Sequence, residues 1–298
     1  MKKAMVICMT LLGVFCLAGC AGNQAKEEEG KEQQAAQAET AVTYSNIADE
    51  ETRALTEKLL KEAGVSEKKR EVFFNHLDQM NQSAEKEWLT AGFEKAEPTE
   101  TKYDPFEMQE QWERKNGTFM GYNCRITAFG LISDFINAAP ATELNTEDLC
   151  FDLFALQEDP AAVSEEELAK FTALYAVAQT EETKDIAVHV KNLQKAWKDR
   201  GVAFAEDEKM KLISVVLHTQ FEKGDDHLLI GHAGILLPQE DGTLYFLEKV
   251  AFQEPYRINV FHDRGEVEAY LMAKYDVDEN QPTAKPFIME NDEPMQSK

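Results

Sequence analysis

The sequence predicts an α+β fold in which helices come first and an antiparallel sheet follows. From about residue 49 to residue 201, apolar residues recur at helical spacing. From Lys211 onward the chain is rich in β-branched and apolar residues, with Gly-containing turns between the runs. Helices and strands that are segregated along a chain in this way are typical of α+β proteins. About 250 residues follow Tyr44, enough for one large domain or for one domain with a helical extension.

The first residues predict an export signal, residues 1–19. Lys2 and Lys3 precede an apolar run that is too short to span a bilayer comfortably. The run ends in Leu17-Ala18-Gly19-Cys20, which resembles the lipobox of bacterial lipoproteins. The resemblance implies cleavage before Cys20 and a diacylglyceryl thioether on its sulfur. An ordinary secretory peptide is the alternative, and both place the mature protein outside the cytoplasm.

Residues 20–43 are expected to form the lipidated cysteine and a disordered tether. The stretch after Cys20 is rich in Glu, Gln, Lys and Ala and has no apolar pattern that builds a core. Lipidation at Cys20 implies a protein anchored on the extracytoplasmic face of the cell membrane.

Charge and cysteine content narrow the possible functions. The net charge is −24, which argues against nucleic acid as a partner. After removal of the signal, Cys124 and Cys150 accompany the lipidated Cys20, so this is not a disulfide-rich scaffold, although a bridge between Cys124 and Cys150 remains open. The sequence indicates no cofactor.

Residues 44–120 are expected to form a helical N-terminal region. A helix is predicted from Asp49 to Ala63, where Gly64 ends it, and a second helix begins after Ser66. A short helix is expected from Glu107 to Lys115.

The stretch from Gly121 to Phe129 carries the most distinctive chemistry. Asn123 is a suitable N-cap for an apolar helix running to about Asn137, and this puts Cys124 at the first helical position. The positive end of the helix dipole favours a thiolate there. The alternative is that Cys124 is a small buried apolar residue.

The remaining elements follow in order. Leu149–Leu156 is interpreted as buried packing, Ser164 begins a capping box, and Thr183 opens a further helix that ends at Gly201. The predicted strands and last helix are 211–221, 227–237, 243–252, a helix over 266–275, and an edge strand at 286–289.

A cysteine on a helix, then a histidine on a strand, then a polar residue on the next strand is the order found in papain-like folds. Gly231–Leu237 begins with His232, and Glu248 follows 16 positions after it, which resembles the NlpC/P60 and CHAP peptidoglycan amidases. The resemblance implies residues 121–298 as a papain-like core, in which a Cys-bearing helix packs on the C-terminal antiparallel sheet. It implies Cys124 as nucleophile, His232 as proton carrier and Glu248 as the residue orienting the imidazole.

The expected substrate is a peptidoglycan stem peptide or another surface amide. The backbone amide of Cys124 is then an oxyanion donor, with a side chain from Asn123 or Tyr122 as the second.

The hairpin loop between the second and third strands decides whether His232 and Glu248 share a face. A two-residue loop, Asp241-Gly242, turns Glu248 to the opposite face. A three-residue loop, Glu240-Asp241-Gly242, pairs His232 near Val250 and puts both side chains on one face, one diagonal step apart. Both lengths are common, and the triad requires the longer loop.

A broader resemblance covers nearly the whole mature chain. Tyr44-Ser45-Asn46, Phe73-Phe74, Asn123–Phe129 and Gly231–Gly234 together resemble an uncharacterised family of Gram-positive surface lipoproteins, of the domain of unknown function 4300 type. That resemblance supplies no substrate, so a non-catalytic lipoprotein that binds a ligand or protein partner is the alternative function.

A metal site is not expected from the histidines of the strands. His218, His227 and His232 are not joined by a Cys or carboxylate at a recognisable ligand spacing.

Overall fold

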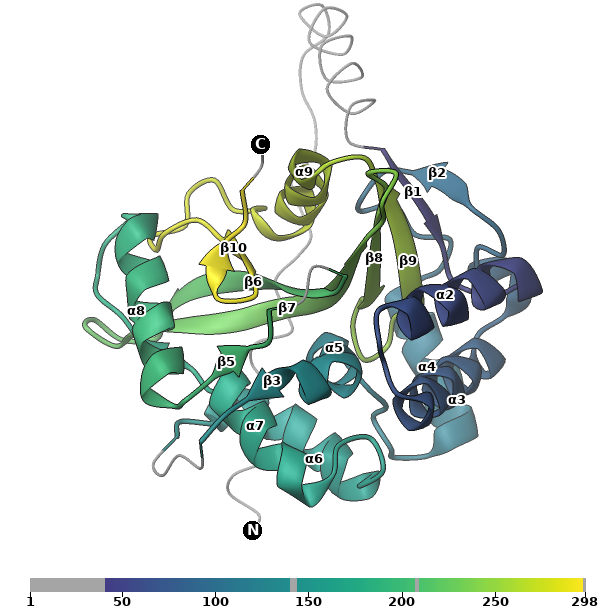
Figure 1. The fold of residues 1–298 in the computed structure, drawn as a ribbon, viewed down its shortest axis with the longest axis horizontal. Coiled ribbons are helices and arrows are strands. Elements are labelled where there is room, and N and C mark those ends of the chain that lie inside the picture. Colours follow the sequence, from purple (N-terminus) through teal and green to yellow (C-terminus); the bar gives the residue numbers. More distant parts are fainter. Residues whose placement is uncertain (1–40, 140–143, 207–208, 297–298) are drawn as a thin grey trace, which may run out of the picture. The chain divides into compact units, whose positions relative to one another are not determined.

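Helices cover both faces of a long antiparallel sheet (Figure 1). The computed structural model describes residues 41–139, 144–206 and 209–296, and in that part of the chain the large sheet has nine strands. The strand order is β11-β10-β6-β7-β8-β9-β1-β2, with β4 beside β7. The strands are β1 (Val42–Ser45), β2 (Glu94–Ala96), β4 (Ala178–Gln179), β6 (Lys211–Gln220), β7 (Asp226–Pro238), β8 (Leu244–Lys249), β9 (Tyr256–Phe261), β10 (Phe287–Glu290) and β11 (Glu293–Pro294). A separate pair joins β3 (Ile136–Asn137) to β5 (Ala203–Phe204).

Eight α-helices surround the sheet in the described part of the chain, so the predicted α+β class is confirmed. They are α2 (Glu50–Glu62), α3 (Glu67–Ser83), α4 (Pro105–Asn116), α5 (Cys124–Ile132), α6 (Cys150–Glu158), α7 (Glu165–Tyr175), α8 (Ile186–Asp199) and α9 (Arg264–Tyr275). Short 3-10 turns occupy η3 (Lys86–Trp88), η4 (Ser133–Phe135) and η5 (Glu147–Leu149). The capping box predicted at Ser164 is present. The export signal, the tether and Cys20 lie outside the described residues.

Two features of the sheet differ from the sequence prediction. The region 44–120 is not wholly helical, because β1 pairs with both β2 and β9 and so joins the C-terminal sheet. The strand β9 was not predicted, since Arg257 and Asn259 interrupt its apolar run. Both polar residues point to one face, which is the period-2 pattern of a strand.

Two apolar segments also differ in structure from the sequence prediction. The helix α5 ends at Ile132 rather than near Asn137, because Ile136 turns away and pairs with Phe204 of β5. The segment Leu149–Leu156 was expected to be buried, but it is only partly so: most of it belongs to helix α6, on which Phe151 and Phe154 are exposed.

The two faces of the sheet pack against different helices. On one face, Ala233, Ile235 and Leu247 belong to the large core that includes α5. On the other face, Leu236 and Phe246 join a smaller core with α9. The helix α5 therefore packs against β7 and β8 from the face opposite α9 (Figure 1).

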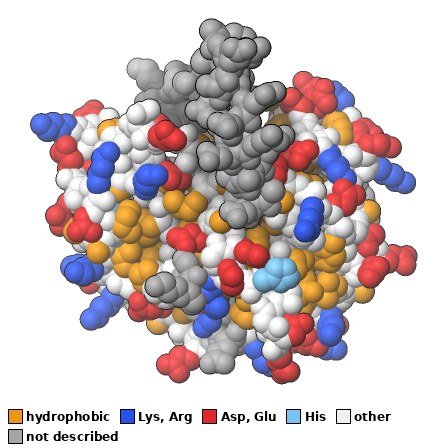
Figure 2. Space-filling view, turned by 90° about the horizontal axis from the view of Figure 1, so that it is seen from above, with side chains coloured by type: hydrophobic (Ala, Val, Ile, Leu, Met, Phe, Trp, Pro, Cys, Tyr) orange, Lys and Arg blue, Asp and Glu red, His pale blue; other side chains and the backbone are white. Residues whose placement is uncertain are grey.

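The surface is mixed in charge on the side seen in Figure 2, where acidic and basic side chains are interspersed around hydrophobic ones. Within the described residues, none of the helices is both long and apolar enough to cross a membrane.

Replacing Gly121 by Ala should destabilise the turn that leads into α5. Gly121 has φ +85°, and an added Cβ would lie 2.9 Å from the buried indole of Trp112. We expect a loss of about 2–4 kcal/mol in urea unfolding, from backbone strain of about 1–2 kcal/mol plus overpacking. Gly224 has the same φ with nothing near its added Cβ, so Gly224→Ala is the matched control and should show the strain alone. Equal losses in the two variants would contradict the packing argument.

Candidate active site

The helix α5 presents the thiol of Cys124 at its first residue. Asn123 has an extended backbone (φ −111°, ψ −173°), and its side-chain oxygen accepts a hydrogen bond from the amide of Ile126 at 3.0 Å. This confirms the N-cap that the sequence predicted. The unpaired N–H groups and the dipole at this end of a helix favour a negative charge, so the fold places Cys124 where a thiolate is stabilised.

The strand β7 brings the imidazole of His232 to a carboxylate on β8. His232 Nε2 lies 2.6 Å from Glu248 Oε2, and each residue is 1% exposed. The ladder pairs Gly234 with Glu248, and the same register continued by two residues sets His232 opposite Val250. Of the two registers that the sequence left open, this is the one that the triad requires.

The loop that sets this register has three residues. Pro238 pairs with Leu244, and the amide of Gln239 donates to the carbonyl of Thr243 at 2.8 Å. Gly242 adopts φ +89°, the left-handed conformation expected for this loop.

A β-bulge fixes the direction of His232. On the other side of β7, Val216 pairs with Ile230 and Val215 with His232, so Gly231 is the extra residue. Bulges bend a strand and re-aim its side chains. An added Cβ on Gly231 would lie 2.5 Å from the Leu217 side chain, so a larger residue here would have to displace that side chain.

One ring nitrogen of His232 remains for the thiol. Nε2 is engaged with Glu248, while Nδ1 is buried and has no hydrogen-bond partner of good geometry among the described residues. The ring stacks on Tyr275 with centroids 5.1 Å apart. Cys124 and His232 lie close enough to shift each other's pKa.

The electrostatics favour a thiolate–imidazolium pair. Burial raises the pKa of the Cys124 thiol, but the charge and hydrogen bond of His232, the charge of Arg125 and the amide of Ala233 outweigh it, and the pKa is lowered. Burial lowers the pKa of His232, but the negative charges of Cys124 and Glu248 raise it to about 9. Each charge is stabilised by the other.

The carboxylate of Glu248 has two further donors that the sequence analysis missed. Asn259 Nδ2 donates to Oε1 at 3.0 Å, and the hydroxyl of Tyr270 donates to the same oxygen. Burial raises the pKa of Glu248, but the bond and charge of His232, the charge of Lys274 and the Tyr270 bond lower it to about 2. The alternating pattern of β9 was the signal for Asn259. No local pattern marks Tyr270.

A second buried network holds the start of α5, and it was also missed. Arg125 forms a two-pronged ion pair with Asp152, with Nε–Oδ1 at 2.9 Å and Nη2–Oδ2 at 2.6 Å. Its Nη1 donates to the carbonyl of Ile230 on β7 at 2.9 Å, and Asn123 Nδ2 donates to Asp152 Oδ1 at 2.8 Å. Arg125 therefore ties α5, α6 and β7 together next to the thiol.

The two side chains predicted as oxyanion donors are engaged elsewhere. Asn123 uses its oxygen as the N-cap and its nitrogen on Asp152. The hydroxyl of Tyr122 donates to Asp159 at 2.7 Å, and its ring stacks on His76 at 3.6 Å. Both side chains therefore have partners within the protein, and their role as oxyanion donors stays a prediction.

A buried lysine lies on the other side of the site. Lys249 is fully buried, and its ammonium donates to the carbonyls of Ala251 (2.5 Å), Phe252 (3.1 Å) and Glu254. Burial lowers its pKa to about 7, against the charges of Glu254 and Cys124. These bonds fix the β8–β9 connection beside the thiol.

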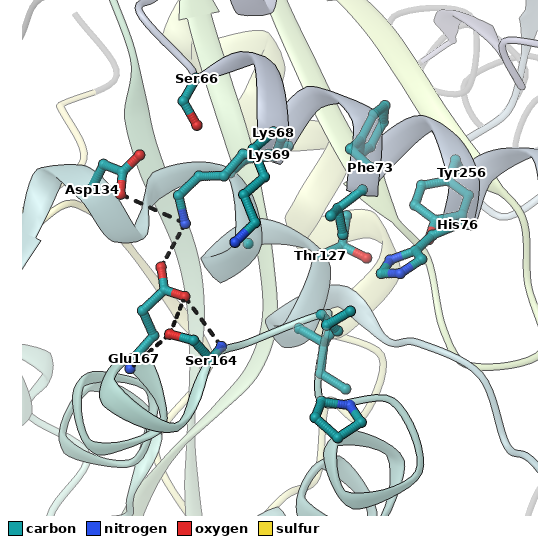
Figure 3. Close-up of a pocket in the computed structure, with 17 residues that line it drawn as sticks. Ser66, Lys68, Lys69, Phe73, His76, Thr127, Asp134, Ser164, Glu167 and Tyr256 are labelled. Carbon is teal, nitrogen blue, oxygen red and sulfur yellow. Dashed lines mark hydrogen bonds and ion pairs between the residues drawn. The ribbon is translucent and has the colours of Figure 1, made fainter.

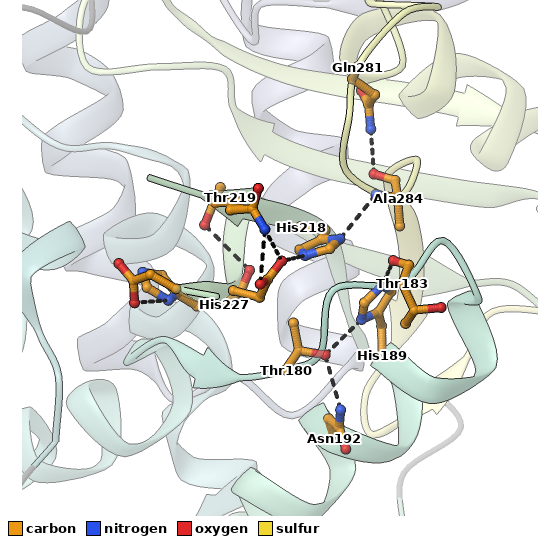
Figure 4. A network of polar contacts seen from close by, with 12 residues as sticks. Thr180, Thr183, His189, Asn192, His218, Thr219, His227, Gln281 and Ala284 are labelled. Carbon is orange, nitrogen blue, oxygen red and sulfur yellow. Dashed lines mark hydrogen bonds and ion pairs between the residues drawn. The ribbon is translucent and has the colours of Figure 1, made fainter. Parts of the chain in front are cut away.

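The histidines of β6 and β7 do not converge on one point. His218 Nε2 lies 2.8 Å from Asp226 Oδ1, and its Nδ1 accepts a bond from the amide of Ala284 at 3.0 Å (Figure 4). His232 faces Glu248 instead. Among the described residues, no group of three His, Cys, Asp or Glu side chains is placed to hold a metal ion. Cys124 and Cys150 are not bridged, so the disulfide alternative is wrong.

A cavity of about 370 Å³ is bordered by helix α5, which begins at Cys124 (Figure 3). Thr127 of α5, Phe73 and His76 of α3, and Tyr256 of β9 contribute to its walls. Cys124 is 6% exposed and is not part of the lining. It lies one helical turn before Thr127.

Fold and site together define a mixed α+β protein with a buried thiol–imidazole–carboxylate series. The chain belongs to the family described as Domain of unknown function (DUF4300), whose model matches residues 43–295. No curated protein and no solved structure was found to match the chain. The family match spans α5, β7 and β8, so the candidate site lies inside the family's domain.

The thiolate of Cys124 should persist well below the ordinary thiol pKa of about 8.5. Acid titration of the thiolate ultraviolet absorbance, as the difference between the wild type and Cys124→Ala, removes the contribution of Cys150. His232→Ala should move the midpoint upward, because burial still raises the pKa while the compensating charge is lost. A wild-type midpoint at or above about 8.5 would contradict the ion pair.

Proposed function

We propose that this protein is a cysteine hydrolase that cleaves amide bonds. Cys124 is the nucleophile, His232 carries the proton, and Glu248 orients the imidazole. The observation that carries the proposal is the continuous buried series from thiol to imidazole to carboxylate, in which the 2.6 Å contact to Glu248 leaves Nδ1 of His232 for Cys124. A thiol at a helix start, a base beside it and a third group that orients the base form the arrangement needed for nucleophilic catalysis.

The proposed reaction has two steps. The Cys124 thiolate attacks the amide carbonyl carbon, and the imidazolium of His232 gives its proton to the leaving nitrogen as the C–N bond breaks. An amine departs and a thioester remains. A water molecule then attacks the thioester, His232 takes the water proton and returns a proton as the C–S bond breaks, and the carboxylic acid leaves.

The oxyanion is proposed to be held by the backbone rather than by a side chain. The N–H of the first helical residue has no intrahelical acceptor, and in α5 that residue is Cys124 itself. A backbone donor at this position points toward the carbonyl that the sulfur attacks.

We also propose that the protein is related in arrangement to papain-like enzymes. A Cys-bearing helix that packs on an antiparallel sheet, with His232 and Glu248 on neighbouring strands, is consistent with a papain-like arrangement. The resemblance to NlpC/P60 and CHAP amidases makes a peptidoglycan stem peptide the substrate class to test first, and a surface protein the second.

The proposed location is the extracytoplasmic face of the cell membrane. The support is in the sequence: Lys2 and Lys3, the apolar run, and Leu17-Ala18-Gly19-Cys20. A lipid on Cys20 would hold the domain near the cell wall, where such substrates occur.

One observation favours the alternative, a non-catalytic lipoprotein that binds a ligand or protein. Cys124 and His232 are almost fully enclosed, and neither lines the cavity that borders α5. The two functions differ in turnover, so the activity of variants separates them.

Cys124→Ala should abolish hydrolysis of cell-wall fragments, followed as new amines by mass spectrometry. We expect a loss of at least about 10³-fold, because the nucleophile is removed. Glu248→Gln should cost about 10²-fold or more, since a neutral amide no longer stabilises the imidazolium. Cys150→Ala is the thiol control and should retain activity. Full activity in Cys124→Ala would refute the catalytic role.

Replacing Cys20 by Ala should release the protein from the membrane fraction of the producing cell. The lipid is attached through this sulfur in the proposed mature form, and the rest of the anchor sequence is unchanged. Fractionation and immunoblotting of wild type and Cys20→Ala provide the measurement, with Cys16→Ala as the control. Unchanged membrane retention of Cys20→Ala would show that another feature anchors the protein.

A further inference from the structure

The cavity beside Cys124 has the properties of a ligand pocket. Its volume of about 370 Å³ falls within the range of small-molecule sites, about 300–1,000 Å³. Its walls come from α3, α5 and the segment that begins α7, and apolar side chains such as Phe73, Val72 and Leu131 contribute to them (Figure 3).

The cavity adjoins the thiol through two connections. Thr127, on its wall, is three residues after Cys124, and residues at this spacing on a helix have Cβ atoms about 5–6 Å apart. His76, also on the wall, stacks on Tyr122, which is two residues before Cys124. The cavity wall therefore includes a residue within one helical turn of Cys124.

A glycine within α5 keeps this cavity open. Gly130 lines the cavity, and a Cβ added to it would meet only the carbonyl of Ala162, at 3.8 Å, an ordinary contact. Glycine inside a helix costs about 1 kcal/mol relative to alanine. Neither a tight neighbour nor a positive φ requires glycine here, and its effect is to leave space in the cavity.

Two buried hydroxyls face the cavity and each other. Thr127 Oγ1 and the Tyr256 hydroxyl are both enclosed and make no hydrogen bond of good geometry among the described residues, although they lie close enough for Thr127 to lower the pKa of Tyr256 against the effect of burial. Both residues belong to the cavity lining. Buried hydroxyls are normally hydrogen-bonded, so a polar atom of a ligand is a natural partner for them.

The charged groups at the rim leave one cation without a partner. Lys69 is neutralised by Glu167 at 2.6 Å and Asp134 at 3.7 Å. Lys68 also lines the cavity and has no ion pair or hydrogen bond within the described residues (Figure 3). In a protein of net charge −24, an unpaired ammonium over an apolar cavity favours an anion there.

We propose that this cavity is the substrate-binding pocket of the Cys124 site and that it binds a largely apolar peptide portion bearing one carboxylate. Lys68 holds the carboxylate, the walls take the apolar part, and Thr127 and Tyr256 hydrogen-bond to a backbone amide. The assignment of the cavity as a substrate pocket rests on the proposed hydrolase function, whereas the class of ligand is inferred from the cavity alone.

Binding is measured in Cys124→Ala, so that the result does not depend on turnover. The probes are N-acetyl-Leu-Leu with a free carboxylate and the same dipeptide as its carboxamide, titrated by calorimetry. The carboxylate should bind more tightly. Lys68→Ala should weaken it by about two- to fivefold, the range of an exposed ion pair, and leave the carboxamide unchanged. Lys61→Ala removes an equal charge on α2, outside the cavity, and serves as the control.

Occlusion tests the location of the site. Gly130→Ala should retain binding and Gly130→Phe should abolish it for both probes, with Gly130→Leu as a smaller occluding variant should the Phe variant not fold. Methyl NMR of Ile126 and Leu131 should show shifts on addition of the carboxylate probe. Binding that survives occlusion, or no binding with no methyl shifts, overturns the pocket. The thiolate titration of Cys124 is independent of these measurements, so failure of the catalytic proposal is separately visible.

Discussion

A buried carboxylate is the constraint on which the candidate site depends. Glu248 is 1% exposed, and an ionised carboxylate removed from water is costly unless donors surround it. Its donors are His232 of β7, Asn259 of β9 and Tyr270 of α9. Because these three elements meet only in the complete fold, the sheet register, the three-residue hairpin loop and the docking of α9 are all needed to keep this charge buried.

The need of a buried charge for partners of opposite charge applies to the imidazole and the thiol as well as to the carboxylate. A charged imidazole beside Glu248 needs a negative partner on its other side, and a thiolate of Cys124 is that partner. Burial opposes both charges, so the pair persists only while α5 is held in position. Arg125 provides this restraint through its two-pronged contact with Asp152 and its bond to the carbonyl of Ile230. The polar interior is thus one connected arrangement rather than separate ion pairs.

The parts of the site that depend on local rules could be predicted from the sequence only where those rules give one answer. The N-cap at Asn123 follows from a side chain and the helix after it, whereas the common face of His232 and Glu248 depends on a loop length that the sequence left open between two and three residues. Asn259 and Tyr270 depend on how β9 and α9 pack, which no local pattern specifies. Asp152 lies within the apolar segment Leu149–Leu156, and no local pattern indicates that it pairs with Arg125.

Comparison of three of the buried histidines, His189, His218 and His232, explains why only His232 is assigned a chemical role in the proposal. His218 uses one ring nitrogen with Asp226 and the other with the amide of Ala284, and His189 uses both on Thr180 and the carbonyl of Thr183. A base needs a free nitrogen, so these two rings are committed to holding the fold. His232 uses one nitrogen on its carboxylate and leaves the other beside a thiol. Burial alone therefore does not single out His232; what distinguishes it is a ring nitrogen without a partner of good geometry that lies close to a thiol.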